Sequence, residues 1–418
     1  MIIMKKCILL ILVSCVFICI SISPIANSIT LNKKTILLKS DDEISDNDIE
    51  ISDTLFDAFI KFLMKIGHKP SVATGIIYKD ELVRSKGYGY YDIENEKQAT
   101  TETLYLQASV SKTITATAIM QLYEQGKFEL TDDVNDYLPF EMRNPNHPNL
   151  PITFEMILSH HSSLAYDNEY WLCLSYLPGD PDVPSFPYPW LEEYLTPGGS
   201  AYSSSTWSDE KPGEKFLYAN VGFSIIAYLV EILSNQDFNE YCRENIFDPL
   251  EMYNSSYRLK DHDIGSIAVP YEYKNKQFFR HPHYGIHLLY PAITLRTSIE
   301  EYSHFIIAMM NGGVWNNVRI LNQSTIDLMH TPPFQPEDKY NYGLGWQIIK
   351  LESGEVQIHH GGGYVGVHCH VLIKPEKEIA VILFSNELDS ELRASRIEIR
   401  AFYMIEQILL FKANRLAS

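Results

Sequence analysis

A serine and a lysine three residues apart are the first pair in the sequence that could carry chemistry. Ser109 and Lys112 follow an extended stretch and begin an apolar helical pattern. In a helix, residues three apart lie on the same face, so the amine could reach the hydroxyl. A serine hydroxyl becomes a good nucleophile when a neighbouring base takes its proton, and a desolvated lysine is one such base. The alternative is that Ser109 only caps the helix.

A tyrosine and an asparagine could complete this pair. Tyr-x-Asn occurs twice, at 218–220 and at 273–275. The first copy directly precedes an apolar helix, whereas the second lies in a polar stretch typical of a loop, so we take Tyr218 and Asn220. A tyrosine has a pKa of about 10, and a nearby cation such as Lys112 would lower that pKa and let the phenolate act as a base. The alternative is a core tyrosine beside a turn asparagine.

A histidine followed by three glycines is the third candidate element. His360 precedes the glycines at 361–363, between two predicted strands. Glycines allow a ligand to approach the backbone closely. A strand N–H beside the N–H of Ser109 could then form an oxyanion hole. The alternative is a glycine-rich hairpin corner.

Taken together in the order Ser-x-x-Lys, Tyr-x-Asn and His-Gly-Gly, these motifs make the chain resemble the serine β-lactamase-like family. That family includes class C β-lactamases, penicillin-binding proteins, and related esterases and D-amino-acid peptidases. The resemblance runs from about Thr54 to Leu410 and includes four lesser landmarks at 87–89, 157–164, 248–252 and 342–346.

The resemblance implies a role for each catalytic candidate. Ser109 would be the acylated nucleophile, and Lys112 and Tyr218 would share the general-base role. Asn220 would hold a substrate amide. The implied activity is that of a serine hydrolase, which needs no cofactor or metal.

The resemblance also places two residues on the glycine-rich strand. The backbone N–H groups of Ser109 and Gly363 would form the oxyanion hole, and His360 would bind substrate where many β-lactamases have lysine. A histidine lacks the permanent charge that receives a carboxylate, and it is common in the esterase and peptidase branches. An esterase or peptidase is therefore favoured over a strict β-lactamase. Ser163 and Glu251 stand where the family usually has glycine, so the shape of the pocket stays open.

The elements around these motifs predict an α+β fold. Consecutive strand patterns with short turns indicate an antiparallel sheet, flanked by N- and C-terminal helices, with an inserted and mostly helical region at about 108–290. The aromatic-rich segment 165–210 is either a cover over the pocket or a surface insertion. Strands are expected at 72–78, 82–91, 344–350, 356–360, 365–373 and 379–384, and helices at 54–66, 111–125, 225–233, 238–247, 298–310 and 388–410.

The N-terminal segment predicts export. A short basic start, an apolar run from 7 to 20 and small residues at 26–28 are typical of a signal peptide. No charge occurs from 7 to 32, so an uncleaved membrane anchor is the alternative. We expect a signal peptide or anchor at 1–28, an acidic linker at 29–53 and a catalytic domain at 54–412. The protein is then secreted or extracytoplasmic, free or tethered to a membrane.

Composition narrows the classes of partner and function. The net charge of −19 argues against a nucleic-acid partner, so a small molecule or peptide is the expected substrate. The bond cleaved would be an amide or ester in a D-amino-acid peptide, a small ester or a β-lactam. His-x-His at 281–283 and 368–370 leaves a histidine-metal hydrolase as an alternative. A non-catalytic binding or scaffold protein of the same fold is the other.

Overall fold

The computed structural model describes residues 53–165, 177–179, 189–285, 288–334, 341–388 and 396–417. The chain separates into two compact units, Met1–Ile60 and Lys61–Ser418. The predicted signal segment and nearly all of the predicted acidic linker lie outside the described residues. Helix α2 (Asp53–Ile66) begins in the first unit. None of the described helices combines the length and the apolar character that a membrane span requires.

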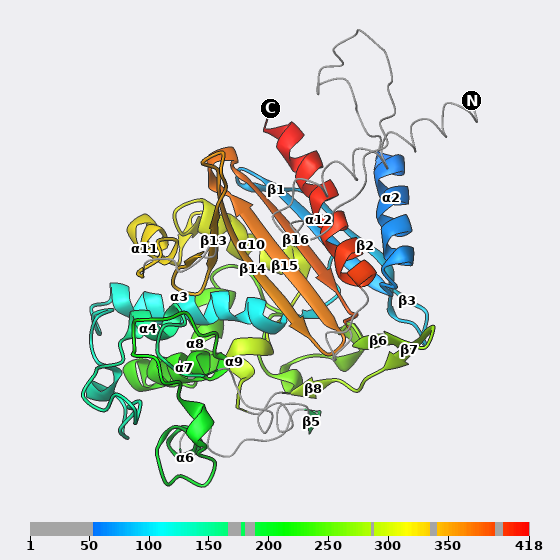
Figure 1. The fold of residues 1–418 in the computed structure, drawn as a ribbon. Helices are drawn as coiled ribbons and strands as arrows, with labels where there is room; N and C mark the ends of the chain where they lie inside the picture. Colours follow the sequence, from blue (N-terminus) through cyan, green and yellow to red (C-terminus); the bar gives the residue numbers. More distant parts are fainter. Residues whose placement is uncertain are drawn as a thin grey trace, which may run out of the picture. The chain divides into compact units, whose positions relative to one another are not determined.

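An eight-stranded antiparallel sheet is the centre of the second unit (Figure 1). Its order, β12-β13-β14-β15-β16-β1-β2-β3, places the early hairpin beside the last strand, because β1 pairs with β16. The sheet thus joins the two ends of the unit. Its strands are β1 (Ser71–Tyr78), β2 (Glu81–Asp92), β3 (Lys97–Gln98), β12 (Asn341–Tyr342), β13 (Gln347–Lys350), β14 (Val356–Tyr364), β15 (Val367–Lys374) and β16 (Ile379–Ser385).

The central strands β15 and β16 are buried along their whole length because helices cover both faces of the sheet. Every residue of β15 and of β16 is buried, which is the pattern of a strand covered on two sides. Helix α12 (Arg396–Leu416) and helix α10 (Ile299–Met310) both pack on β1 and β16, α12 on the near face in Figure 1 and α10 on the far face.

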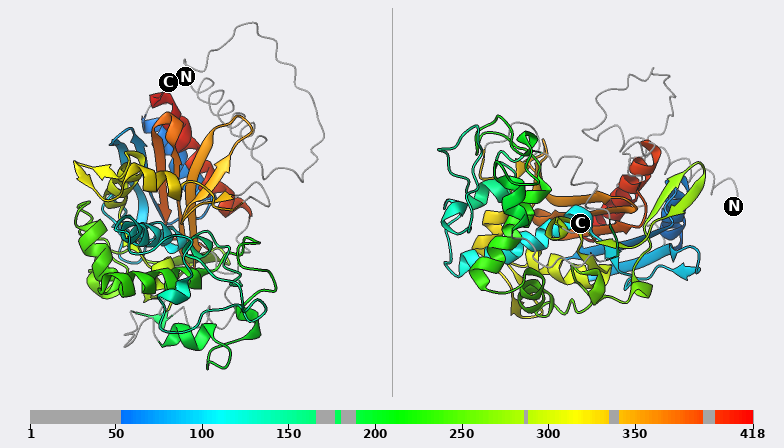
Figure 2. Two further views of the ribbon diagram at one scale, coloured as in Figure 1. Left: turned by 90° about the vertical axis from the view of Figure 1, so that its left-hand side faces the viewer. Right: turned by 90° about the horizontal axis from the view of Figure 1, so that it is seen from below.

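A mostly helical region lies beside the sheet, and Figure 2 shows it from two further directions. Helix α3 (Ser111–Glu124) packs against α7 (Asn220–Ser234). Its first twelve residues, 111–122, are all buried, because small and apolar side chains on every side suit a helix in the interior. The remaining described α-helices are α4 (Phe154–Leu158), α6 (Trp190–Leu195), α8 (Phe238–Cys242), α9 (Tyr290–Ile293) and α11 (Gln323–Met329), and a π-helical turn, Arg243–Phe247, follows α8.

Four small two-stranded sheets connect these parts. The pair β4–β9 lies next to the candidate serine turn in the sequence, and the pair β6–β7 forms a hairpin whose second strand is exposed at every residue. The strands are β4 (Tyr105–Leu106) with β9 (Arg296–Thr297), β5 (Leu177–Pro178) with β8 (Tyr284–Gly285), β6 (Tyr271–Lys274) with β7 (Gln277–Arg280), and β10 (Val314–Trp315) with β11 (Val318–Arg319).

The predicted α+β architecture is confirmed, with corrections at particular ends. The glycines at 361–363 are not a hairpin corner, because they lie inside β14 and pair with β15. The strand predicted from 344 begins only at Gln347, because Gly345 has a φ of +81° and packs so closely that an added Cβ atom would lie 2.4 Å from the Cβ of Ala116. In the segment 165–210, Trp207 is buried and its indole N–H donates to the carbonyl of Leu195 at 3.0 Å, whereas 166–176 and 180–188 lie outside the described residues.

Candidate active site

A short 3₁₀ turn presents Ser109 immediately before helix α3. The turn, η3, comprises Ala108–Val110, and α3 begins at the next residue. Ala108 has a φ of +46°, a left-handed conformation that is uncommon for a residue with a side chain and marks a locally strained backbone. Ala108 and Val110 are buried, but Ser109 between them is only half-buried. The turn therefore leaves Ser109 partly exposed between two buried residues.

Strand β14 lies directly against this turn through Gly362. A Cβ atom added to Gly362 would lie 2.3 Å from the carbonyl oxygen of Gln107 and 3.2 Å from the backbone nitrogens of Ser109 and Val110. Only glycine fits so close a backbone approach. The next residue, Gly363, is exposed. The backbones of the turn and of β14 are thus adjacent at the serine, as two converging oxyanion N–H donors require.

Lys112 is fully buried beneath Ser109, and three segments of the chain meet at its amine. Its Nζ atom lies 3.1 Å from the Ser109 hydroxyl oxygen, 2.7 Å from Oδ1 of Asn220 and 3.0 Å from the carbonyl oxygen of Ala292. An ammonium group has three N–H donors and can bond to all three of these acceptors. In its neutral form the amine has a lone pair, and at this distance it could accept the proton of the Ser109 hydroxyl.

Tyr218 lies beside the same amine. The Nζ atom of Lys112 is 5.0 Å from the centre of the Tyr218 ring, within the range of a cation–π contact. The structure therefore brings Ser109, Lys112, Tyr218 and Asn220 together. The second Tyr-x-Asn copy, at 273–275, belongs to the β6–β7 hairpin, which carries none of these residues.

His360 is fully buried and has both ring nitrogens engaged. Its Nδ1–H donates to the carbonyl of Gly361 at 2.8 Å, so Nε2 accepts the hydroxyl hydrogen of Tyr342 at 2.7 Å. Burial first, and then the charge of Lys112, hold the pKa of His360 well below its usual range. The ring is therefore neutral. To touch a substrate directly, it would have to exchange its hydrogen bond with Tyr342.

His160 is a component of this cluster that the sequence reasoning did not single out. Its ring lies 4.2 Å from the Tyr218 ring, centre to centre, and its Nδ1 accepts the backbone N–H of Ala219 at 3.2 Å. The available signal was its place in the landmark 157–164, but that pattern does not say where the ring points.

The histidine pairs proposed as metal ligands have other partners. His281 bonds to Glu272 at 2.7 Å, and the ring of His368 stacks on Phe402 at 3.6 Å. His370 bonds to Glu406. Across the described ranges, no three histidine, cysteine or acidic side chains are placed to hold a metal ion.

A serine-bearing turn over a buried lysine, beside an antiparallel sheet with helices on both faces, defines the β-lactamase/transpeptidase-like fold. The Beta-lactamase family profile matches residues 56–403. The chain therefore belongs to the Beta-lactamase family, whose members are generally serine hydrolases.

Individual relatives agree with this assignment. Protein flp of Staphylococcus aureus (strain MRSA252) is 24% identical over 342 residues, which cover 80% of this chain and 63% of that protein, so the chain spans less than two thirds of its length. The octameric penicillin-binding protein homologue from Pyrococcus abyssi is 25% identical with a TM-score of 0.69, covering 86% of this chain and 78% of the other.

Two further solved structures share the fold. EstCE1, a hydrolase with promiscuous acyltransferase activity, superposes with a TM-score of 0.67 at 18% identity, over 85% of this chain and 100% of the other. D-amino acid amidase from Ochrobactrum anthropi SV3 superposes with the same TM-score at 17% identity, over 87% and 99%.

Proposed function

We propose that this chain is an exported serine hydrolase that forms an acyl-enzyme at Ser109. The observation that carries the proposal is the buried amine of Lys112, 3.1 Å from the Ser109 hydroxyl and 2.7 Å from Asn220. A buried basic group within hydrogen-bond distance of a half-exposed hydroxyl is the arrangement that activates a serine.

The reaction would proceed in two acyl transfers. Lys112 in its neutral form, together with Tyr218, takes the proton of the Ser109 hydroxyl while the serine oxygen attacks the carbonyl carbon of an ester or amide. The N–H groups of Ser109 and Gly363 stabilise the oxyanion. The leaving alcohol or amine receives the proton as its bond to the carbonyl breaks. A water molecule then attacks the acyl-enzyme, releasing the acid and returning the proton to Ser109.

The substrate preference follows from the neutral state of His360. A lysine at this position would attract the carboxylate that penicillins carry, and a partly buried contact of that kind contributes about 2–3 kcal/mol. His360 is buried, bonded to Tyr342 and neutral. We therefore propose neutral esters or D-amino-acid peptides and amides as better substrates than β-lactams. The hydrolase EstCE1 and the D-amino acid amidase, which share this fold, are consistent with the same preference.

Intact-mass measurement tests the proposal directly. The purified protein is exposed to p-nitrophenyl esters, D-amino-acid amides and penicillins, and the mass gained on Ser109 is located by peptide mapping. We expect acylation by esters or D-amides, and a kcat/KM for p-nitrophenyl butyrate above that for nitrocefin, with the gap narrowed in His360→Lys. Adducts on another residue contradict the site. No adduct and no turnover with any substrate would favour the non-catalytic binding protein.

Export through residues 1–28 is a separate part of the proposal. The support is the sequence of that segment, a basic start followed by an apolar run. Expression of the full chain followed by fractionation and N-terminal sequencing tests it. A chain that begins near residue 28 outside the cytoplasm supports a cleaved signal, an intact chain in the membrane fraction supports an anchor, and an intact cytoplasmic chain contradicts export.

A further inference from the structure

His160 occupies a buried position directly behind the candidate base Tyr218. It follows helix α4 and is 1% exposed. Its φ is +62°, in the left-handed region where histidine and asparagine occur more often than most residues. This backbone conformation sets the direction in which the ring leaves the chain.

Two hydrogen bonds join His160 to the residues on either side of Tyr218. The backbone N–H of Leu217 donates to the His160 carbonyl oxygen at 2.7 Å. The N–H of Ala219 donates to Nδ1 of the His160 ring at 3.2 Å. Because both flanking residues are fixed to one residue, the backbone that carries Tyr218 has little freedom to shift.

The imidazole ring also contacts the side chain of Tyr218. The two ring centres are 4.2 Å apart, with an interplanar angle of 33°. On its other sides the imidazole meets Phe223 at 5.4 Å and Tyr342 at 4.7 Å. The ring of Tyr218 therefore contacts both the imidazole of His160 and the amine of Lys112, whose Nζ atom is 5.0 Å from the centre of the Tyr218 ring.

The protonation state of His160 suits this role. Since Nδ1 accepts the Ala219 N–H, it carries no proton, and the neutral ring has its proton on Nε2. Burial first, then the charges of Lys112, His360 and His161, lower the pKa of His160 well below its usual range. A neutral ring adds no positive charge next to Lys112.

We infer that His160 is a positioning residue for Tyr218, which it fixes through the two backbone bonds and the ring contact so that the phenol stays beside Lys112. This inference rests on the proposed function, in which Tyr218 shares the general-base role. His160 itself touches no reacting atom. Its effect should therefore depend on the Tyr218 hydroxyl.

The decisive experiment is a double-mutant cycle measured as kcat and KM for p-nitrophenyl butyrate. General-base contributions are about 10²–10⁴-fold, so we expect His160→Ala to lower kcat about 10²-fold with KM within about two-fold. In a Tyr218→Phe background, the same change should lower kcat by less than about three-fold, because no hydroxyl remains to be positioned. An equal loss in both backgrounds overturns the inference.

A conservative variant separates positioning from folding. His160→Asn keeps an oxygen acceptor for the Ala219 N–H and tolerates the positive φ, but it loses the ring contact. We expect the kcat of His160→Asn to be about ten-fold higher than that of His160→Ala. If His160→Ala does not fold, His160→Asn replaces it in the double-mutant cycle. His359→Asn is the matched control, a buried neutral histidine of β14 bonded to His370, and it should keep kcat within about two-fold.

Failure of the inference can be told apart from failure of the proposed function. If Ser109→Ala retains turnover, the proposed function fails. If Ser109 is acylated and Tyr218→Phe is slow, but His160→Ala and His160→Asn both turn over at the native rate, only the inference fails. A pH profile of kcat adds a further readout, since displacement of Tyr218 from Lys112 should shift its limbs, whereas simple loss of folded protein lowers the profile without moving them.

Discussion

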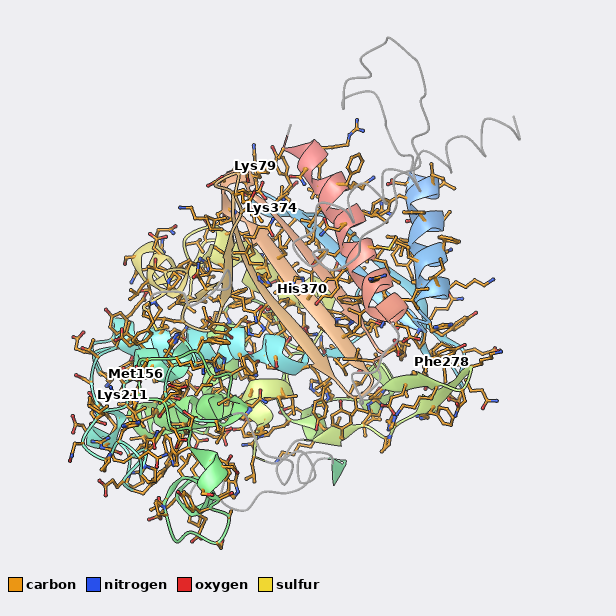
Figure 3. The ribbon with its side chains drawn as sticks, viewed as in Figure 1. Lys79, Met156, Lys211, Phe278, His370 and Lys374 are labelled. Atoms are coloured by element: carbon orange, nitrogen blue, oxygen red, sulfur yellow. The ribbon has the colours of Figure 1, made fainter. Side chains whose placement is uncertain are left out.

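Two adjacent histidines of strand β14 occupy different environments. His360 bonds to Tyr342, in the cluster that contains Lys112. The Nδ1 atom of His359 lies 3.2 Å from Nε2 of His370, whose other nitrogen bonds to Glu406 of α12. Figure 3 labels His370 midway along β15, beside that helix. Successive strand residues point to opposite faces of a sheet, which separates the two environments.

The difference lies in the partners and not in burial. Burial is the first cause of the lowered pKa of both rings, to about 3 for His359 and well below the usual range for His360. The second cause for His360 is the charge of Lys112, and for His359 it is the neighbouring His370. One face of the sheet therefore serves the candidate chemistry, and the other binds the C-terminal helix. Changes on the first face should alter rates, and changes on the second should alter stability.

The largest expected effect is at Ser109, in the candidate active site. Ser109→Ala should lower kcat by about three to six orders of magnitude. The free energy of unfolding should change by less than about 1 kcal/mol, because this hydroxyl is only half-buried. Ester hydrolysis and a urea titration on the same preparation check both statements. Retained turnover, or an acyl adduct elsewhere, would show that the site has been misplaced.

Variants of Lys112 and Tyr218 test whether these two side chains act together in one proton transfer. Lys112→Ala and Tyr218→Phe should each slow acylation by about 10²–10⁴-fold. The double variant should be slowed by much less than the product of the two, because groups that share one proton transfer are not additive. Pre-steady-state acylation rates provide the measurement. Strict additivity in the logarithm of the rate would mean that the two groups work separately.

A pair of neighbouring glycines tests the close approach of β14 to the serine turn. In Gly362→Ala the new methyl group meets the Gln107 carbonyl at 2.3 Å, which must displace backbone, whereas in Gly363→Ala it meets the flexible end of Leu388 at 3.0 Å. We expect Gly362→Ala to lower kcat/KM by about 10²-fold, the scale of losing one oxyanion donor, and Gly363→Ala to have a clearly smaller effect. Equal effects would contradict this packing.

The opposite face should give the reverse result. Glu406→Gln removes the carboxylate from a buried acid–histidine pair that joins α12 to β15. We expect the free energy of unfolding to fall by about 1–3 kcal/mol, the usual cost of weakening a buried hydrogen bond. The kcat/KM for an ester should stay within about two-fold. A strong loss of activity at unchanged stability would show that the two faces are coupled.

The smallest expected effect is a pH dependence of stability due to His359. Its folded pKa is about 3 and its unfolded pKa is about 6.5, so between these values the unfolded state binds more protons. Stability from this group is therefore complete above about pH 6.5 and declines as the pH falls toward 3. His359→Gln should reduce the stability lost between pH 7 and pH 6 by roughly 0.5–1 kcal/mol. Parallel urea titrations of both proteins at the two pH values measure it, and identical losses would contradict the assignment.

The sequence predicts the sheet better than it predicts the site. Continuous apolar runs such as 379–384 indicate a strand that is covered on both faces, because a strand with one exposed face would alternate apolar and polar residues. The spacing of Ser109 and Lys112 likewise predicts their contact within one local stretch. The contact of Lys112 with Asn220 needed a resemblance to other proteins, because 108 residues separate the two.

Other features had no sequence signal strong enough to find them. From the sequence alone, Gly362 is equally consistent with a turn and with a close backbone contact, because glycine is common in both. The structure shows the close contact, with the Gln107 carbonyl. Lys112 also donates a hydrogen bond to the backbone carbonyl of Ala292. Every residue has such a carbonyl, so the sequence does not identify this acceptor. The orientation of the His160 ring depends on a positive φ that cannot be predicted from the amino-acid sequence.

The hydrogen bonds of Lys112 to Ser109, Asn220 and Ala292 also bear on how the protein reaches its active state. Its partners lie 3, 108 and 180 residues away along the chain. Contacts between distant residues must close long loops and tend to form late in folding. The amine can therefore meet all three acceptors only after the helical region and the residues before β9 have assembled on α3. Recovery of hydrolysis during refolding would then report the last stage of assembly, later than the return of helical structure.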